Sequence, residues 1–476
     1  MQQSMLEKDN TLLSKQRWII PWVVAIAMFM ETLDTTILGT AIPTIARDFQ
    51  LNPVDLKIAL TSYLLSLSIF IPISGWIADK FNAKYIFFTA IGLFTLSSLM
   101  CGMTHGLYTL VLARFIQGIG ASMMLPVGRL IVMQSFSKAE FAKAMQTVIV
   151  PSLLGPAFGP SIGGIILHIA NWHWIFFVNI PFGILGLIIT YWCIPVVKPA
   201  HKVPPLNWTG FLLFASALTI LSFTLSALSD ALIPMNLIII TSIIAVGLFV
   251  IYFIHSRSQP YPLLNLSLFK IYSFTTTITA GFLARIAISA LPFLLPLLLQ
   301  IEWGTSALVS GLYFLPFGLG MMLAKLLMIR NWLKRYGFRK VILINTLLLS
   351  INTVFLAFFG ALHFSIPFII LLFIQGMLAS QQYTALGTLY VMELKSDCFS
   401  QATSIYSTAQ QLSAGFGVAI AAILLKTCAI FHKGIIFTPE VFFTTFVILS
   451  GIILLSLPIV FKLNGAIKLP ESRAAA

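Results

Sequence analysis

The chain has 476 residues, of which 59% are hydrophobic and only 9% are charged. Soluble domains carry about 25% charged residues, so this composition excludes a soluble enzyme and indicates a protein that crosses the membrane many times. A net charge of +14 would suit a nucleic-acid binder. The basic residues cluster in alternate loops, however, so membrane topology explains the charge and no nucleic-acid partner is expected.

Fourteen apolar stretches are each long enough, at about 20 residues, to cross a bilayer as a helix. Their predicted starts are Trp18, Leu56, Lys84, Leu107, Ala142, Trp174, Trp208, Met235, Tyr272, Ala307, Lys340, Ile366, Gln401 and Val441. An even number of spans places both termini on one side of the membrane. With that side as the cytoplasm, most of the 28 Lys and Arg residues fall in cytoplasmic segments, so the positive-inside rule predicts that both termini are cytoplasmic.

Two acidic residues, Glu31 and Asp34, lie in the middle of the first apolar stretch. A charge at the centre of the bilayer costs on the order of 3 kcal/mol or more on insertion scales. A spacing of three residues places both side chains on one face of a helix. This pattern indicates a proton or cation site.

Two short segments recur along the chain at nearly the same offset. Residues 115–122 recur as 373–380, and the loop 80–84 is echoed by 335–339. The repeat predicts an all-α polytopic membrane protein built from two parallel six-helix bundles related by an axis along the membrane normal. The predicted parts are an N-terminal tail (1–17), an N-terminal bundle (18–198), a linker with two extra spans (199–260), a C-terminal bundle (261–463) and a C-terminal tail (464–476).

Two motifs, one in the loop after the second span and one inside the fourth span, contain charged residues that could take part in the mechanism of the protein. The loop after the second span contains Gly75, where helices would approach closely, followed by Asp79 and Lys80. These two charges would form a latch between helices, or else a short basic loop that only sets topology. Arg114, followed by Gln117, lies inside an apolar stretch and needs a carboxylate or several carbonyl partners. The acids of the first span are the expected partners, in either a structural salt bridge or a proton-coupling pair.

The fifth span combines repeated glycines with prolines. Gly155, Gly159 and Gly163 recur every four residues, which makes a groove where another helix backbone can pack. Pro156 and Pro160 remove intrahelical hydrogen bonds and would kink the helix. The combination predicts a hinge or a moving seal, with ordinary membrane packing as the alternative.

The C-terminal half contributes basic residues to the predicted centre of the protein. The repeat offset places Arg285 opposite the acids of the first span and Lys325 at mid-membrane, unless the lysine snorkels to the interface. Aromatic residues, including Tyr313, Tyr383 and Tyr406, are candidates to line a substrate cavity. With acids in one half and bases in the other, the cavity would suit zwitterionic or anionic groups, or would bias proton release.

These motifs resemble the major facilitator superfamily, and specifically its branch of fourteen-span drug:proton antiporters. The resemblance covers nearly the whole chain, and within the branch it is to proposed multidrug exporters of bacteria. The segments that carry it are Leu33 to Pro43, Gly75 to Lys84, Leu112 to Gly118, Gly155 to Gly164 and Trp172 to Pro181.

The resemblance implies a proton-driven antiporter that exports a small, amphipathic molecule by rocking its two halves about a central cavity. The Arg114 segment corresponds to the motif tied to proton coupling, and the fifth-span motif to the mark of exporters. Asp34 is then the expected proton carrier, because burial disfavours the charged carboxylate. Glu31 would bind a substrate cation or share the proton, and Arg114 would tune both acids.

The sequence also departs from the pattern of the branch. Gly39 stands where asparagine is usual, and Glu31 where a neutral glutamine is frequent. Asn82 and Ala83 replace the usual glycine and arginine of the signature loop, which weakens the predicted latch. The extra acid at position 31 favours a cationic substrate or a second proton site.

The expected partners are a small-molecule substrate, protons and the lipid bilayer, with the proton gradient as the energy source and no cofactor or metal. A monomer in the bacterial inner membrane is expected, with or without a periplasmic adaptor. The alternatives are a dedicated exporter of one metabolite, siderophore or peptide, and an uptake symporter. An intramembrane enzyme is disfavoured, because all seven histidines fall in loops or at span ends and no HExxH or GxSxG motif occurs.

Overall fold

The computed structural model describes residues 17–196, 205–228, 233–327, 329–390, 392–394, 398–432 and 434–463. The predicted tails therefore lie outside the described residues, except for Arg17, as does the beginning of the predicted linker, residues 199–204. The described segments form helices and contain no strand, so the all-α class is confirmed.

Most long helices begin within a few residues of the predicted starts of the spans, because each long apolar stretch satisfies its backbone hydrogen bonds internally as a helix. The exception is helix α14 (Ile329–Ala361), which begins at Ile329 and is interrupted at Gly337, shortly before the predicted start at Lys340. In chain order the helices are α2 (Ile19–Asp48), η1 (Pro53–Leu56), α3 (Lys57–Phe81), α4 (Ala83–Gly102), α5 (Leu107–Ser135), α6 (Lys138–Ile169), α7 (Trp174–Phe177), α8 (Asn179–Cys193), α9 (Trp208–Ala227), α10 (Met235–Ser258), η2 (Leu266–Lys270), α11 (Tyr272–Leu297), η3 (Leu298–Glu302), α12 (Ala307–Leu312), α13 (Phe314–Leu327), α14 (Ile329–Ala361), α15 (Ser365–Leu389), α16 (Phe399–Phe431), α17 (Pro439–Leu454) and α18 (Leu457–Phe461).

Thirteen helical segments among the described residues are long and apolar enough to cross a membrane. The fifth predicted span corresponds to α6. Among the described residues, only its part Leu154–Ile169 forms an apolar helical segment, and this segment is too short to be counted with the thirteen. The protein is thus a multi-pass membrane protein, and a count of fourteen spans stays a prediction.

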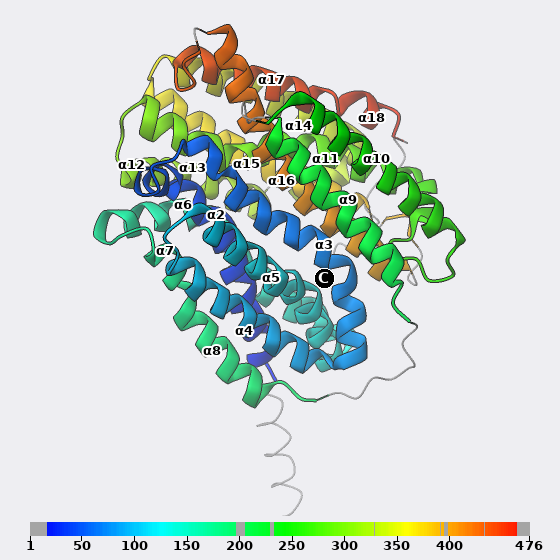
Figure 1. Cartoon of the computed structure of the whole chain (residues 1–476). Helices are drawn as coiled ribbons and strands as arrows, with labels where there is room; N and C mark the ends of the chain where they lie inside the picture. Colours follow the sequence, from blue (N-terminus) through cyan, green and yellow to red (C-terminus); the bar gives the residue numbers. More distant parts are fainter. Residues whose placement is uncertain are drawn as a thin grey trace, which may run out of the picture.

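The helices gather into two groups (Figure 1). Helices α2 to α8, drawn in blue to blue-green, pack on one another, as do α11 and α13 to α18, drawn in yellow-green to red. Helices α9 and α10 pack against each other, and α9 also contacts α3 and α16. The extra pair therefore covers a seam between the two groups.

The two repeated segments adopt matching conformations. Asn82 and Gly337 occupy equivalent positions in the repeated loop, and both have a positive φ, of 74° and 75°. Asparagine and glycine are the residues that tolerate this backbone region best. The Cβ atom of an alanine at Gly118 would lie 2.7 Å from the Tyr63 carbonyl oxygen of α3, and one at the equivalent Gly376 would lie 1.9 Å from that of Phe317 in α13. The same helix pair is therefore closely packed in each half.

Candidate functional site

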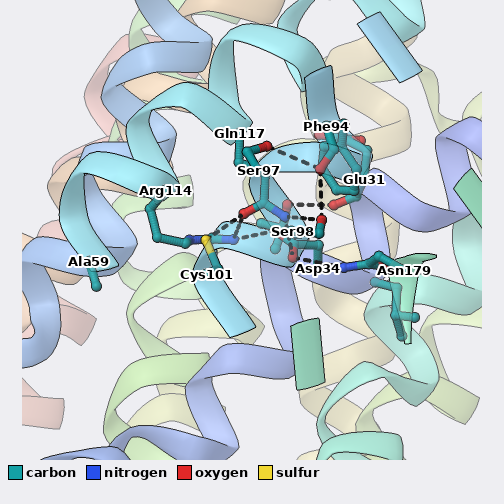
Figure 2. A network of polar contacts seen from close by, with 12 residues as sticks. Glu31, Asp34, Ala59, Phe94, Ser97, Ser98, Cys101, Arg114, Gln117 and Asn179 are labelled. Atoms are coloured by element: carbon teal, nitrogen blue, oxygen red, sulfur yellow. Dashed lines mark hydrogen bonds and ion pairs between the residues drawn. The ribbon is translucent and has the colours of Figure 1, made fainter. Parts of the chain in front are cut away.

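Asp34 lies at the centre of a polar network that is completely enclosed by protein (Figure 2). Its side chain is fully buried, and its carboxylate accepts hydrogen bonds from three side chains on two other helices, α5 and α8. Arg114 of α5 forms an ion pair with Oδ2. Gln117 Nε2 of α5 and Asn179 Nδ2 of α8 donate to Oδ1 at 3.0 and 3.2 Å. All three side chains thus donate to the one carboxylate of α2.

Arg114 is as deeply buried as its partner, with an exposed fraction of 0%. Its Nη1 atom also donates to Gln117 Oε1 at 2.6 Å, and its guanidinium lies 4.1 Å from the ring centroid of Tyr63. Gln117 in turn donates to Ser98 Oγ of α4 at 2.8 Å. The Nε and Nη2 atoms of Arg114 have no hydrogen-bond partner among the described residues, so the ion pair with Asp34 is its main electrostatic compensation.

Glu31 lies one turn before Asp34 but outside this network. Its residue is 8% exposed, and its carboxylate accepts no hydrogen bond from the described part of the chain. Figure 2 shows it on the same helix as Asp34, away from Arg114. The two neighbouring acids of α2 therefore differ in their surroundings. Asp34 has a cationic partner, and Glu31 has none among the described residues.

The glycines of the fifth span pack directly on α2, at the level of the acids. A Cβ atom at Gly155 would lie 2.7 Å from Leu33 N, one at Gly159 would lie 2.1 Å from Thr36 Oγ1, and one at Gly163 would lie 2.9 Å from the Ile37 carbonyl oxygen. The threonines of α2 donate hydrogen bonds into the same contact, to the carbonyl oxygens of Gly155 at 3.2 Å and Pro160 at 3.1 Å. Helix α6 continues through Pro156 and Pro160.

The opposite face of α6 contacts the other half of the protein. A Cβ atom at Gly164 would lie 2.7 Å from the Ala307 carbonyl oxygen of α12, and one at Gly318 of α13 would lie 2.4 Å from the Cα atom of Ala157. Ser161 Oγ donates to the Gly311 carbonyl oxygen at 2.8 Å. The predicted glycine repeat thus packs within one half, and its neighbours on the opposite face form the contact between halves.

Further contacts join the two halves on the side where α2 ends, which the basic residues predict to be the outer side. Gly39 lets α11 approach, since a Cβ atom there would lie 2.3 Å from the Pro292 carbonyl oxygen. Gln300 donates to the Thr40 carbonyl oxygen at 2.9 Å. An ion pair of 2.9 Å links Asp55 to Lys426 of α16. Together with the contacts of α6, these contacts join the two halves on the side where α2 ends.

Gly75 does not have the role that its motif predicts. A Cβ atom at Gly75 would meet nothing within 4 Å, so in this structure it allows no close helix approach. Asp79 and Lys80 are both exposed. Asp79 forms no ion pair among the described residues, and the Lys80 ammonium lies 4.6 Å from the centroid of Trp76. The latch is therefore not closed here.

The basic and aromatic residues of the C-terminal half that were predicted to line a central cavity lie at three separate positions in the structure. Arg285 of α11 is buried and donates to the Tyr406 hydroxyl at 2.7 Å, and its guanidinium lies 4.9 Å from the centroid of Tyr383. Tyr313 packs instead on Trp303, at 5.9 Å between ring centroids. Lys325 is exposed in the last turn of α13. The structure thus joins Arg285 to Tyr383 and Tyr406, and it places Tyr313 and Lys325 elsewhere.

Two further residues, Asn179 and Ser98, complete the polar network, and the sequence did not predict a role for either of them. Asn179 lies in the segment Trp172 to Pro181 at the start of the sixth span. A polar side chain in this apolar stretch could have indicated a buried hydrogen-bond partner. Ser98 lies in an apolar stretch with other small polar residues, and nothing in the sequence distinguishes it from them. Both contacts depend on how α4 and α8 pack against α5 and α2.

His173, which lies outside the spans, has a perturbed pKa. His173 lies between α6 and α7, stacked on Trp172 at 3.8 Å between ring centroids. Burial lowers the pKa of His173, because it disfavours the charged imidazolium, although the nearby Asp48 opposes this effect. Asp48 also accepts a hydrogen bond from the Trp172 indole at 2.9 Å, so the group connects α2 to the start of α7.

Comparison with known proteins identifies the family to which this architecture corresponds. A family model described as "Major Facilitator Superfamily" matches residues 24–278 and again 277–474. A protein of Escherichia coli O17:K52:H18 named "Putative multidrug resistance protein MdtD" is 38% identical over 421 residues, which are 88% of this chain and 87% of that protein. A protein of the same name from Pectobacterium carotovorum is 37% identical over 446 residues, 93% and 94% of the two chains.

Solved structures share the fold at low sequence identity. A D-xylose-proton symporter superposes with a TM-score of 0.66 at 14% identity, covering 94% of this chain and 99% of the other. The nucleoside transporter NupG gives a TM-score of 0.64 at 14% identity, covering 93% and 99%. These likenesses concern the fold alone.

Proposed function

Because this chain belongs to the major facilitator superfamily, a family of transporters rather than enzymes, we propose that it is a proton-coupled antiporter that exports small amphipathic compounds. The observation that carries this proposal is the buried Asp34 carboxylate with a single cationic partner. A buried carboxyl group is a suitable proton carrier, since a change of its charge is felt strongly where water is excluded.

Protonation of Asp34 would change the packing of the N-terminal half. The ionised carboxylate accepts hydrogen bonds from Arg114, Gln117 and Asn179, which tie α2 to α5 and α8. A proton on Oδ2 removes the negative charge and replaces an acceptor by a donor that faces the guanidinium. Arg114 then loses its counter-charge, and the three helices lose the contact that joins them. This coupling supports a rocker-switch cycle in which proton uptake favours one arrangement of the two halves.

The direction of transport is proposed from the relatives and from α6. The bacterial relatives carry the name of a multidrug resistance protein, which fits export of more than one compound. Helix α6 contacts α2 on one face and α12 and α13 on the other, so a movement of α2 would reach the contact between the halves. We place the protein in the bacterial inner membrane with both termini in the cytoplasm, as a monomer with or without a periplasmic adaptor.

The test is transport by the purified full-length protein in liposomes. Ethidium serves as a cationic probe and dansyl-glycine as an anionic one, each measured with and without an imposed pH gradient. The wild type should accumulate a probe only with the gradient. Asp34→Asn should lose this gradient-driven transport, whereas Glu393→Gln, which makes the same carboxyl-to-amide change at an exposed position, should retain it.

Two results would count against the proposal. Full gradient-driven transport by Asp34→Asn would show that Asp34 is not the proton carrier. Wild-type transport at the same rate with and without the pH gradient would show that the protein is not coupled to protons.

A further inference from the structure

The most unusual charge outside the Asp34 network is the guanidinium of Arg285. The residue is 5% exposed and lies in α11 at membrane depth. We propose that Arg285 binds an anionic group, such as a carboxylate, of the transported compound. This inference rests on the transport function proposed above and specifies the class of its substrate.

The neighbours of Arg285 are neutral. Its Nη2 atom donates to the Tyr406 hydroxyl at 2.7 Å. With the amide of Gln410 in its favoured orientation, the carbonyl oxygen of that side chain accepts from Nη2 and Nη1 at 2.8 and 3.2 Å. No carboxylate lies within ion-pair distance among the described residues, whereas buried Arg114 has Asp34. A buried guanidinium without a counter-charge is costly, and a bound anion would supply that charge.

The surroundings of the guanidinium suit an amphipathic anion. The ring centroids of Tyr383 and Tyr406 lie 4.9 and 5.0 Å from its central carbon, and Tyr390 stacks on Tyr406 at 4.3 Å with an interplanar angle of 8°. Aromatic rings beside a guanidinium hold its plane while leaving an edge for in-plane acceptors. A carboxylate matches the edge formed by Nη1 and Nη2, because two parallel N–H donors can bind its two oxygens. There it would replace the single oxygen of Gln410, which accepts from both atoms in the structure. The tyrosines then offer apolar surface to the rest of the ligand.

The position of this group fits a site that both halves share. Tyr390 and Tyr406 belong to an apolar cluster that also contains Ile69 and Ile73 of α3. From the other half, Arg129 of α5 lies within electrostatic range of Tyr390, and it too forms no ion pair among the described residues. Positive charge therefore approaches the stacked tyrosines from both halves, and an anion bound there would be in contact with the seam that opens and closes during transport.

The experiment is equilibrium binding to the purified full-length protein at one fixed pH, without a gradient. Dansyl-glycine carries a carboxylate, and dansyl-glycinamide is its neutral equivalent, so the ratio of their Kd values isolates the charge. Charge-assisted hydrogen bonds of this kind correspond to at least a tenfold preference. We expect the wild type to bind dansyl-glycine at least tenfold more tightly, Arg285→Gln to lose the preference, and Arg285→Lys to keep part of it. Arg257→Gln, a change of an exposed arginine that also lies over an aromatic ring, should keep all of it.

A competition measurement on the wild type alone provides a second test that does not depend on how the variants fold. Benzoate should displace dansyl-glycine and benzamide should not. Equal Kd values for the two dansyl probes, equal displacement by benzoate and benzamide, or a preference that survives in folded Arg285→Gln would each overturn the anion site. These results concern binding without a gradient, so they leave proton-driven transport of ethidium standing. Full gradient-driven transport by Asp34→Asn, which would refute the proton-carrier role, would in turn leave the anion site standing.

Discussion

Replacement of Gly155 by alanine tests how closely α2 and α6 pack beside the acidic residues. The new Cβ atom would lie 2.3 Å from Thr32 Oγ1 and 2.7 Å from both the Thr32 carbonyl carbon and Leu33 N. The threonine side chain can rotate, but the backbone atoms cannot. An ordinary contact needs at least 3.4 Å, so the two helices must separate by about 0.7 Å. Overpacking of this kind costs about 1–3 kcal/mol.

Gly75→Ala provides the matched control, because it is the same substitution in another membrane helix. A Cβ atom at Gly75 would meet nothing within 4 Å, and alanine is favoured over glycine inside a helix by about 1 kcal/mol. The two variants should therefore change stability in opposite directions. Thermal unfolding in detergent, followed by tryptophan fluorescence, should show a lower midpoint for Gly155→Ala and an equal or higher midpoint for Gly75→Ala. A midpoint for Gly155→Ala at or above that of the wild type would refute the close-packing argument.

Two further predictions concern charged groups. Arg114→Gln should destabilise the protein by about 3–5 kcal/mol, since it leaves the Asp34 carboxylate buried without a counter-charge. Adding Asp34→Asn should recover much of that loss in the same unfolding measurement. A double variant no more stable than Arg114→Gln would contradict this. Burial lowers the pKa of His173, so the folded protein binds this proton less tightly than the unfolded chain. Its contribution to stability is present above about pH 6.5 and is lost as the pH falls below that value. His173→Gln should flatten the decline of the unfolding midpoint between pH 7.5 and 5.5. An unchanged decline would argue against a lowered pKa of His173 in the folded protein.

The helices could be predicted from the sequence because a bilayer leaves the chain little choice. Each long apolar stretch must satisfy its own backbone hydrogen bonds, so composition alone located starts such as Trp174, Trp208 and Met235. The repeated loop could also be found, since Asn82 and Gly337 meet the same need for a positive φ. These features depend on local chemistry, which a single sequence records directly.

The partners of the site residues could not be predicted in the same way. A glycine every four residues marks a face that a backbone can approach, but it does not say that α2 covers this face and that α12 and α13 lie behind it. Arg114 requires an acidic partner, and from the sequence alone Glu31 and Asp34 are equally suitable. The orientation of α5 against α2 decides for Asp34. Gly75 is the opposite case. Its motif predicts a close helix neighbour, but among the described residues no atom of another helix lies within 4 Å of a Cβ atom at this position.

The repeat also explains where the response to protons should reside. Gln117 and Gln375 are equivalent in the duplicated segments, yet Gln117 bonds to Asp34 and Arg114, whereas Gln375 bonds to the neutral side chains of Asn352 and Thr353. A network of amides and hydroxyls has no group that titrates at physiological pH. Protonation can therefore change the packing around Gln117 and cannot change the packing around Gln375. It follows that the proposed proton step belongs to the N-terminal half, while the C-terminal half can hold a fixed positive charge at Arg285 for the substrate throughout the cycle.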